Sequence, residues 1–247
     1  MQKLMYAVWR NPMEAPPQFA ERLRTSFADR LLGLAVLGLR INVVDATVLP
    51  GIGLGSDGLR RATIDPQMEA VISLWVHSAT PYRFAEVAEV MREAGERIAG
   101  YAVMESEPLP TPTEEAPLDD RGAGFAQIAF IQRSVNQDPD AWRSRWLDHH
   151  TAVAVETQST FGYRQNLVVH ALQDDGPIWA AIVEEDFPIE ALTDRHAFYA
   201  TDGDSRILEE NRGRMLASTR TFIDHASGLD VIPTSSYLRR DPRRQIR

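Results

Sequence analysis

Apolar and polar residues follow two different spacings in the first half of the chain, and each spacing predicts an element. Four segments have the length and the apolar, β-branched content of strands: 3–10, 40–48, 68–79 and 100–108. Two segments between them have the spacing of amphipathic helices: 17–34 and 82–99. In the first of these helices, apolar residues recur every four positions: Phe19, Leu23, Phe27 and Leu31. The predicted order is strand, helix, strand, strand, helix, strand.

The second half of the chain repeats this order. Its predicted strands are 124–133, 161–172, 177–187 and 229–238. A helix is predicted for 139–157, with Asp138 as its N-cap and Pro139 at the first helical position. A longer helical region, interrupted near ATDGDS, covers 189–224. The same plan therefore occurs twice in one chain.

A segment rich in proline and acidic residues separates the two halves. Residues 107–123 contain four prolines and five acidic residues, a composition typical of an extended linker. We therefore expect a first repeat at 1–106, this linker, a second repeat at 124–238 and a basic tail at 239–247. The tail is expected to be a solvated chain end, and docking to an acidic surface is the alternative.

Each half has the βαββαβ plan of a ferredoxin-like unit. Such a unit is a four-stranded antiparallel sheet with helices on one face, so its other face is apolar and needs a cover. Two units in one chain can cover each other sheet to sheet. The predicted fold class is α+β, with two tandem ferredoxin-like repeats that form an intrachain pseudo-dimeric α/β barrel.

The composition is that of a globular protein, with 247 residues of which 44% are hydrophobic and 25% charged. Cysteine is absent, which excludes disulfides, thiolate metal sites and cysteine nucleophiles. The formal net charge of −9 disfavours nucleic acid as a partner. The sequence has no signal-peptide pattern and no apolar run of the roughly 20 residues that a membrane span requires. We therefore expect a cytoplasmic protein with no membrane contact.

Three features of the sequence suggest chemistries that we reject. Lys3 is the only lysine, so a Schiff base would have to use a residue at the chain end. The segment 53–58, GLGSDG, has the glycine spacing of a dinucleotide-binding loop, but Pro66 leaves no room for the helix that must follow. His149 and His150 are adjacent on a helix and project about 100° apart, so they are poorly placed to chelate one metal ion. We expect no metal and no cofactor.

The helix at 139–157 carries the residues with the most chemical potential. At about 100° per residue, one face of this helix contains Trp142, Trp146, His149 and Val153, and His150 lies at its edge. Helical periodicity alone therefore favours His149 as the inward histidine. Histidine suits a proton-transfer site because its unperturbed pKa lies near neutral pH. The alternative is a core histidine with a satisfied hydrogen bond, beside tryptophans that only pack.

This helix resembles a signature of the EthD-like family, which belongs to the dimeric α/β-barrel superfamily. The family pattern is an aromatic residue, a tryptophan or tyrosine four positions later, and a histidine four positions after that. Trp142, Trp146 and His150 match it. This resemblance therefore favours His150 as the inward residue, whereas periodicity favours His149.

Two further segments support the resemblance. The strand after the helix contains GYRQN, in which Tyr163 and Asn166 match the tyrosine-to-asparagine stretch of the family. The opening KLMYAVWRNP is similar to the family's first strand, an apolar run that ends in arginine and proline. In motif the likeness covers about residues 124–190, and the helix of the first half has no matching histidine.

The resemblance implies a cofactor-independent enzyme of the lyase or cyclase type, a decarboxylase, dehydratase or cyclase that acts on a small aromatic or polyketide-like substrate. His150 would then be the general acid/base, with His149 as the alternative, and Tyr163 would polarise a carbonyl or phenol oxygen. The expected substrate-binding residues are Trp146, Trp142, Asn166, His77 and Arg10.

Several of these residues have a simpler interpretation. Tyr163 and Asn166 lie at odd and even positions of one strand, so they point to opposite faces and cannot both line one pocket without a bulge. His77 ends a strand, where a solvated histidine is common. Arg10 ends the first strand, where it would hold a substrate carboxylate or phenolate, or form an ordinary surface ion pair.

Two other functional classes stay open. One is a non-catalytic protein that binds a small ligand or serves as an accessory protein on the same fold. The other is a haem-associated oxygenase, because some relatives of this barrel bind haem. Two fused units can also pair again, so a homodimer is a further expectation about partners.

Overall fold

The computed structural model describes residues 1–52, 59–173, 175–223 and 228–245. The GLGSDG segment at 53–58 lies outside the described residues. All of the predicted strands are present, although several bounds differ from the predicted ones. The strands are β1 (Gln2–Trp9), β2 (Val36–Val43), β3 (Ala70–Val76), β4 (Arg97–Leu109), β5 (Phe125–Ile131), β6 (Gly162–Ala171), β7 (Ala181–Phe187) and β8 (Leu229–Arg240).

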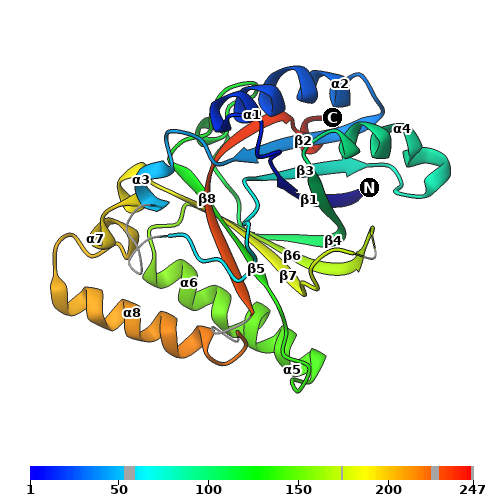
Figure 1. Ribbon diagram of the computed structural model, residues 1–247. Helices are drawn as coiled ribbons and strands as arrows, with labels where there is room; N and C mark the ends of the chain where they lie inside the picture. The colour runs from blue at the N-terminus through cyan, green and yellow to red at the C-terminus, as the bar shows by residue number, and fades with distance from the viewer. Residues whose placement is uncertain (53–58, 174, 224–227, 246–247) are drawn as a thin grey trace.

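The eight strands form one closed antiparallel barrel in the order β1-β3-β2-β8-β5-β7-β6-β4 (Figure 1). The strands of the first half follow the order β4-β1-β3-β2, and those of the second half follow the corresponding order β8-β5-β7-β6. The halves meet where β2 pairs with β8 and where β4 pairs with β6. A sheet closed on itself has no free edge strand. Its inner face encloses one interior, so the two halves cover each other's inner faces.

The longer helices lie on two opposite sides of this barrel, and the short helices near residues 50 and 196 lie close together beside it (Figure 1). The helical segments of the first half are α1 (Pro16–Arg22), η1 (Leu23–Phe27), α2 (Ala28–Leu32), α3 (Leu49–Ile52) and α4 (Pro81–Arg92). Those of the second half are α5 (Pro139–Ser144), η4 (Arg145–His150), α6 (Thr151–Thr157), η5 (Ile189–Leu192), α7 (Arg195–Phe198) and α8 (Ser205–Thr219). Short 3₁₀ turns also occur at Thr113–Glu115 and Pro242–Gln245. In the described part of the chain, no helix is both long and apolar enough to cross a membrane.

The first helix of each half contains one π-helical segment, η1 or η4, where the predictions assumed regular α-helix. The predicted cap of the second-half helix is confirmed, since the Asp138 carboxylate accepts hydrogen bonds from the backbone N–H groups of Asp140 and Ala141. The helix predicted for 82–99 ends early, at Arg92. Gly95 explains this, because a Cβ there would lie 2.2 Å from the Trp9 carbonyl oxygen, so the chain turns where only glycine fits.

The predicted linker is partly attached to the barrel. Strand β4 continues to Leu109, and beyond it Leu118 and Arg121 form single bridges to β8 at Leu238 and Tyr237. These contacts hold the connection between the halves along one side of the barrel.

The inside of the barrel is divided between apolar and charged side chains. One part is an apolar cluster that includes Met5, Tyr101, Phe130, Trp179 and Ile182. The other part contains charged side chains that form ion pairs. The cations are Lys3, Arg40 and Arg164, and the anions are Glu105, Glu184 and Asp186. The Lys3 ammonium lies 2.6 Å from Glu105 and 2.7 Å from Glu184, and Arg164 lies 2.8 Å from Asp186. Buried charges are stable only when paired in this way.

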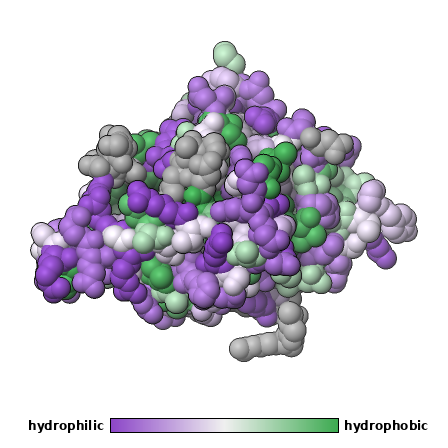
Figure 2. All heavy atoms as spheres, turned by 90° about the horizontal axis from the view of Figure 1, so that it is seen from below, coloured by the Kyte–Doolittle hydropathy of each residue, from purple (hydrophilic) through white to green (hydrophobic). Residues whose placement is uncertain are grey.

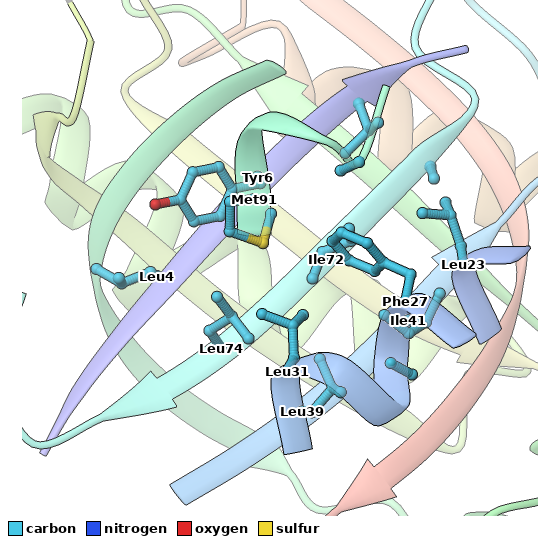
Figure 3. Close-up of a cluster of buried hydrophobic side chains, with 14 of the residues drawn as sticks. Leu4, Tyr6, Leu23, Phe27, Leu31, Leu39, Ile41, Ile72, Leu74 and Met91 are labelled. Atoms are coloured by element: carbon cyan, nitrogen blue, oxygen red, sulfur yellow. The ribbon is translucent and has the colours of Figure 1, made fainter. Parts of the chain in front are cut away.

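The two helix layers pack differently on the outer faces of the sheets. In the first half, η1, α2 and α4 place Leu23, Phe27, Leu31 and Met91 directly on apolar residues of β1, β2 and β3 (Figure 3). In the second half, α6 and α8 lie side by side below the barrel (Figure 1). That side is largely hydrophilic at the surface, with separate small hydrophobic patches (Figure 2).

Candidate functional site

A cavity of about 960 Å³ lies between the second-half sheet and its helices. Its floor is the outer face of β5, β7 and β8, with apolar side chains from Ala129, Ile131, Val183 and Val231. Its other walls come from η4, α7 and α8 and from the segment around residue 60. The volume is within the usual range for small-molecule sites, and the apolar floor is typical of them.

A row of polar residues crosses this apolar floor. Glu185 on β7 is paired with Tyr163 on β6 and with Gln127 on β5. Residues directly opposite one another on adjacent antiparallel strands point to the same face, about 5 Å apart. All three side chains therefore line the cavity together.

His150 lies in the cavity wall and is 7% exposed. Its Nδ1 atom is 2.9 Å from the Ser218 hydroxyl of α8, and its ring lies 4.9 Å from that of Phe222. Burial lowers the pKa of His150 from 6.5 to about 4, so the imidazole is neutral at pH 7. Nδ1 is engaged by Ser218, and no hydrogen bond from a described residue reaches Nε2, so Nε2 is the atom that can exchange a proton with a ligand.

The π-helix explains why His150, and not His149, points inward. A π turn closes its hydrogen bonds over five residues instead of four, so it shifts the phase of the residues that follow. A spacing of four then keeps Trp142, Trp146 and His150 on the buried side, whereas His149 is exposed. A periodicity of about 100° per residue holds only for a regular α-helix, so it favoured the wrong histidine as the inward one.

Glu185 is a buried carboxyl group on the cavity floor. Burial, with a smaller contribution from the nearby charge of Asp186, raises the pKa of Glu185 from 4.5 to about 8. Within the described residues, no hydrogen bond or ion pair reaches its side chain. At pH 7 this group is therefore mainly a neutral acid that can donate a proton.

Tyr163 and Trp146 add two more donors. Burial raises the pKa of Tyr163 above its ordinary value, so its hydroxyl keeps its proton. Trp146 is fully buried, and its Nε1 lies near the Tyr163 hydroxyl but has no acceptor at full hydrogen-bond geometry among the described residues. A buried donor without an acceptor costs free energy unless a ligand or water satisfies it. These N–H and O–H groups are suited to a carbonyl or phenol oxygen.

Trp142 and Asn166 lie close to these residues but outside the cavity lining. The Trp142 indole donates to the Phe222 carbonyl oxygen at 2.9 Å, so this residue supports the wall from behind. Asn166 points into the barrel, where its amide donates to Glu184 at 3.0 Å and to the Ile182 carbonyl oxygen at 2.9 Å. It is on the opposite face from Tyr163, as strand alternation requires.

His77 and Arg10 belong to the first half and do not join this site. His77 is exposed at the end of β3. Arg10 forms an ion pair with Glu69 at 2.9 Å, which satisfies its guanidinium locally. The structure thus brings together Trp146, His150 and Tyr163 from the predicted set.

Glu185 and Gln127 are cavity residues that sequence reasoning missed. In the stretch IVEED, alternation places either Glu184 or Glu185 on the outer face, but the sequence does not give the phase. The pairing of Glu185 with Tyr163 fixes it. Glu184 then points into the barrel, where the charge of Lys3 lowers its pKa against the effect of burial.

The rest of the described chain offers weaker candidates for a site. A second cavity of about 790 Å³ lies beside α1 and α3 and shares Arg60 with the first. Its polar groups are largely paired, as in the hydrogen bonds from Ser235 and Tyr237 to the Asp45 carboxylate. Among the described residues, no group of three or more His, Asp or Glu side chains is arranged to hold a metal ion.

Comparison with known proteins identifies the fold but no family. No family model matches the chain, and no curated protein sequence matches it. A solved anthrone oxidase-like protein is similar over 98% of this chain and 94% of that chain, with a TM-score of 0.53 and 8% sequence identity. A putative monooxygenase from Lactobacillus acidophilus NCFM covers 97% of this chain and 96% of that chain, with a TM-score of 0.47 and 10% identity.

The first of these similarities places the chain in the dimeric α/β-barrel fold, in agreement with the closed barrel. At this level of identity the likeness concerns the fold alone. The EthD-like family itself, and the origin of the barrel from two ferredoxin-like repeats, stay interpretations of the sequence.

Proposed function

We propose that the chain is an enzyme that carries out acid–base chemistry on a small aromatic or polyketide-like carbonyl compound in the second-half cavity. The observation that carries this proposal is that His150 and Glu185 are buried in the wall of one largely apolar cavity, where burial lowers the pKa of the imidazole and raises that of the carboxyl group. A carboxyl group normally has a lower pKa than an imidazole, and here burial reverses that order. Pairs of groups whose pKa values are pushed apart by their surroundings are a common signature of acid–base sites.

The first step is removal of a proton from an acidic C–H group next to a carbonyl. The C–H bond breaks, its electron pair forms the enolate, and the proton moves to Nε2 of His150. Glu185 or Tyr163 donates a hydrogen bond to the developing oxyanion, as does the indole N–H of Trp146. An apolar cavity strengthens each of these interactions because little water competes with them.

The same enolate can then lose a β-leaving group, close a ring or be protonated elsewhere, which are reactions of the lyase or cyclase type. This chemistry needs no cofactor, and we propose a cofactor-independent enzyme. Membership of the EthD-like family and a tandem ferredoxin-like origin of the barrel belong to the same proposal. The histidine at 150, the tyrosine at 163 and the recurrence of strand order in both halves support it.

A test substrate follows from the name of a neighbour that shares the fold. That protein is named anthrone oxidase-like, and anthrone is an aromatic ketone with an acidic CH₂ group. We expect the chain to accelerate exchange of these hydrogens for deuterium in D₂O, measured by proton NMR. His150→Gln should slow exchange by about 10²-fold or more. His170→Gln, a matched change at an exposed histidine of β6, should leave the rate unchanged.

The principal alternative is a non-catalytic ligand-binding protein. It would bind anthrone, detected by quenching of tryptophan fluorescence, and would show no exchange above the buffer rate. A Soret absorption band in the purified protein would instead reveal haem and contradict the cofactor-independent mechanism.

A further inference from the structure

Arg61 extends the floor of the cavity beyond β8. Its backbone forms two hydrogen bonds with Val231, from the Arg61 N–H at 2.9 Å and from the Val231 N–H at 2.8 Å. The segment is also fixed by Asp230, whose carboxylate accepts from the backbone N–H of Thr63 at 2.6 Å and forms a short hydrogen bond with the Thr63 hydroxyl. Arg61 is therefore held in a defined position beside the first residues of β8.

The pairing also determines where the Arg61 side chain points. Arg61 and Val231 are directly opposite in an antiparallel bridge, so their side chains project to the same face. Val231 belongs to the cavity floor, and Arg61 lines the same cavity. Arg61 as a whole is half-buried.

The Arg61 guanidinium differs from the other arginines of this wall. Arg60 donates to the Gln67 side chain, and Arg212 pairs with Glu209 at 2.7 Å. Arg195 also has an interaction of its own. For Arg61, no side-chain partner is present among the described residues. In a chain with a net charge of −9, such a cation is a local binding point for an anion.

The position of Arg61 relative to Glu185 limits the shape of a ligand that contacts both. Three strand-to-strand steps separate them, from β7 to β5, from β5 to β8 and from β8 to Arg61. Neighbouring strands are about 4.8 Å apart. Arg61 is also offset by two residues along the strands, because Gln127 opposite Glu185 pairs with Pro233 whereas Arg61 pairs with Val231, so the backbones are roughly 16 Å apart. The two side chains shorten this gap and leave roughly 10 Å, about the length of two or three fused rings.

We propose that the ligand of this cavity carries a carboxylate that binds Arg61, at the opposite end from the carbonyl that faces Glu185 and Tyr163. The substrate class is then an elongated aromatic or polyketide-like carboxylic acid. This proposal rests on the proposed function, because it concerns the substrate of the same cavity. An arginine–carboxylate pair with two parallel hydrogen bonds provides both affinity and orientation.

Binding of two matched probes tests the proposal. Anthracene-2-carboxylate carries the charge, and anthracene-2-carboxamide is its neutral counterpart of the same size. We expect the wild-type chain to bind the carboxylate at least tenfold more tightly, measured by fluorescence titration at low ionic strength. Arg61→Gln should remove that preference, and Arg61→Lys should keep part of it because a lysine retains the charge without the bidentate geometry.

The control is Arg206→Gln, which makes the same charge change at an exposed residue of α8 that pairs with Glu210. It should keep the tenfold preference. Equal affinity of the wild-type chain for both probes would overturn the proposal, as would a preference that survives in Arg61→Gln. Circular dichroism of each variant shows whether it is folded, and Arg61→Lys tests the site should the glutamine variant not fold.

The failure of this proposal can be distinguished from the failure of the proposed function. His150→Gln should keep the preference for the carboxylate while it loses deuterium exchange. Charge selectivity without any exchange activity in the wild-type chain would support the Arg61 site and contradict the enzyme. Exchange activity with no charge selectivity would support the enzyme and contradict the Arg61 site.

Discussion

The two halves of the barrel have the same strand order but use the space under their helices differently. Counted from Pro16 and Pro139, the first helices place equivalent residues at equal distances: Phe19, Leu23 and Phe27 in the first half, and Trp142, Trp146 and His150 in the second. Phe27 is part of the filled apolar core (Figure 3), and His150 lines the cavity. At this equivalent position the first half has a phenylalanine that packs in the core, and the second half has a histidine that lines the cavity.

The sheets differ in the same way. In the first half, the row Ile41, Ile72 and Tyr6 crosses β2, β3 and β1 and is covered by helices. In the second half, the row Tyr163, Glu185 and Gln127 crosses β6, β7 and β5 and faces a cavity.

The helices over the two sheets also differ in how many of their residues are buried. Helix α4 buries Phe84, Val87 and Met91, whereas α8 buries no residue fully. The first half thus fills the space under its helices with apolar side chains, whereas the second half keeps a cavity there.

The largest effect is expected for His150→Phe, which gives the second half the residue of the first. The phenyl ring occupies a similar volume but cannot accept a proton, so deuterium exchange should fall by about 10²-fold or more. The melting temperature should stay the same or rise, because a neutral buried imidazole is replaced by an apolar ring. A variant with full exchange activity would show that position 150 is only structural.

The reciprocal change, Phe27→His, should affect stability instead of activity. Phe27 is packed among apolar side chains, where an imidazole would be buried without a hydrogen-bond partner. We therefore expect a loss of about 3 kcal/mol in the free energy of unfolding. Urea denaturation measures it. The exchange rate of the folded variant should equal that of the wild-type chain. A loss below about 1 kcal/mol would mean that the two halves tolerate polarity equally.

Glu185→Gln should change how activity and stability depend on pH. The wild-type exchange rate should be highest between about pH 4 and pH 8, where His150 is neutral and Glu185 is protonated, and should fall above pH 8. The glutamine variant, measured over the same range, should lack the decline above pH 8. A decline at the same pH in the variant would assign that limb to another group.

The sign of the stability effect follows from the raised pKa of Glu185. The folded chain holds this proton more tightly than the unfolded chain, so the stabilisation is complete below about pH 4.5 and is lost as the pH rises to about 8. Its size is on the order of a few kcal/mol. His150 acts oppositely, since its pKa is lowered and its contribution is lost as the pH falls from 6.5 to about 4. Urea denaturation of the Glu185→Gln variant and of the wild-type chain over this pH range separates the two contributions.

The smallest effect is expected for Arg214→Ala, which breaks an exposed ion pair between α8 and Glu156 of α6. Exposed pairs contribute about 0–1 kcal/mol, so the melting temperature should change little. A large loss of stability would show that this pair, and not the apolar contacts, holds α8 over the cavity.

The fold was largely predictable because it depends on local patterns. The eight strands, the order of elements and the cap at Asp138 all follow from spacing and composition. The predicted strand at 40–48 was displaced to Val36–Val43, because α2 ends at Leu32 and the chain enters the sheet soon after Gly33. Such shifts depend on contacts that the sequence does not display.

The site was predictable only in part. The family spacing correctly indicated that His150 is the inward histidine, whereas periodicity failed because a π-helix is not visible in the sequence. Glu185 was missed because two adjacent glutamates can be separated only when the phase of the strand is known. The cavity itself depends on how far α8 stands from the sheet, a tertiary property with no local signal.

The barrel interior has a consequence for labelling chemistry. The only lysine of the chain, Lys3, is 4% exposed and lies between two carboxylates. Amine-directed reagents such as succinimidyl esters will therefore find no ε-amino group on the intact barrel, and attachment to a biosensor surface through lysine will select for opened molecules. Reagents that react with arginine or carboxyl groups suit the folded chain better.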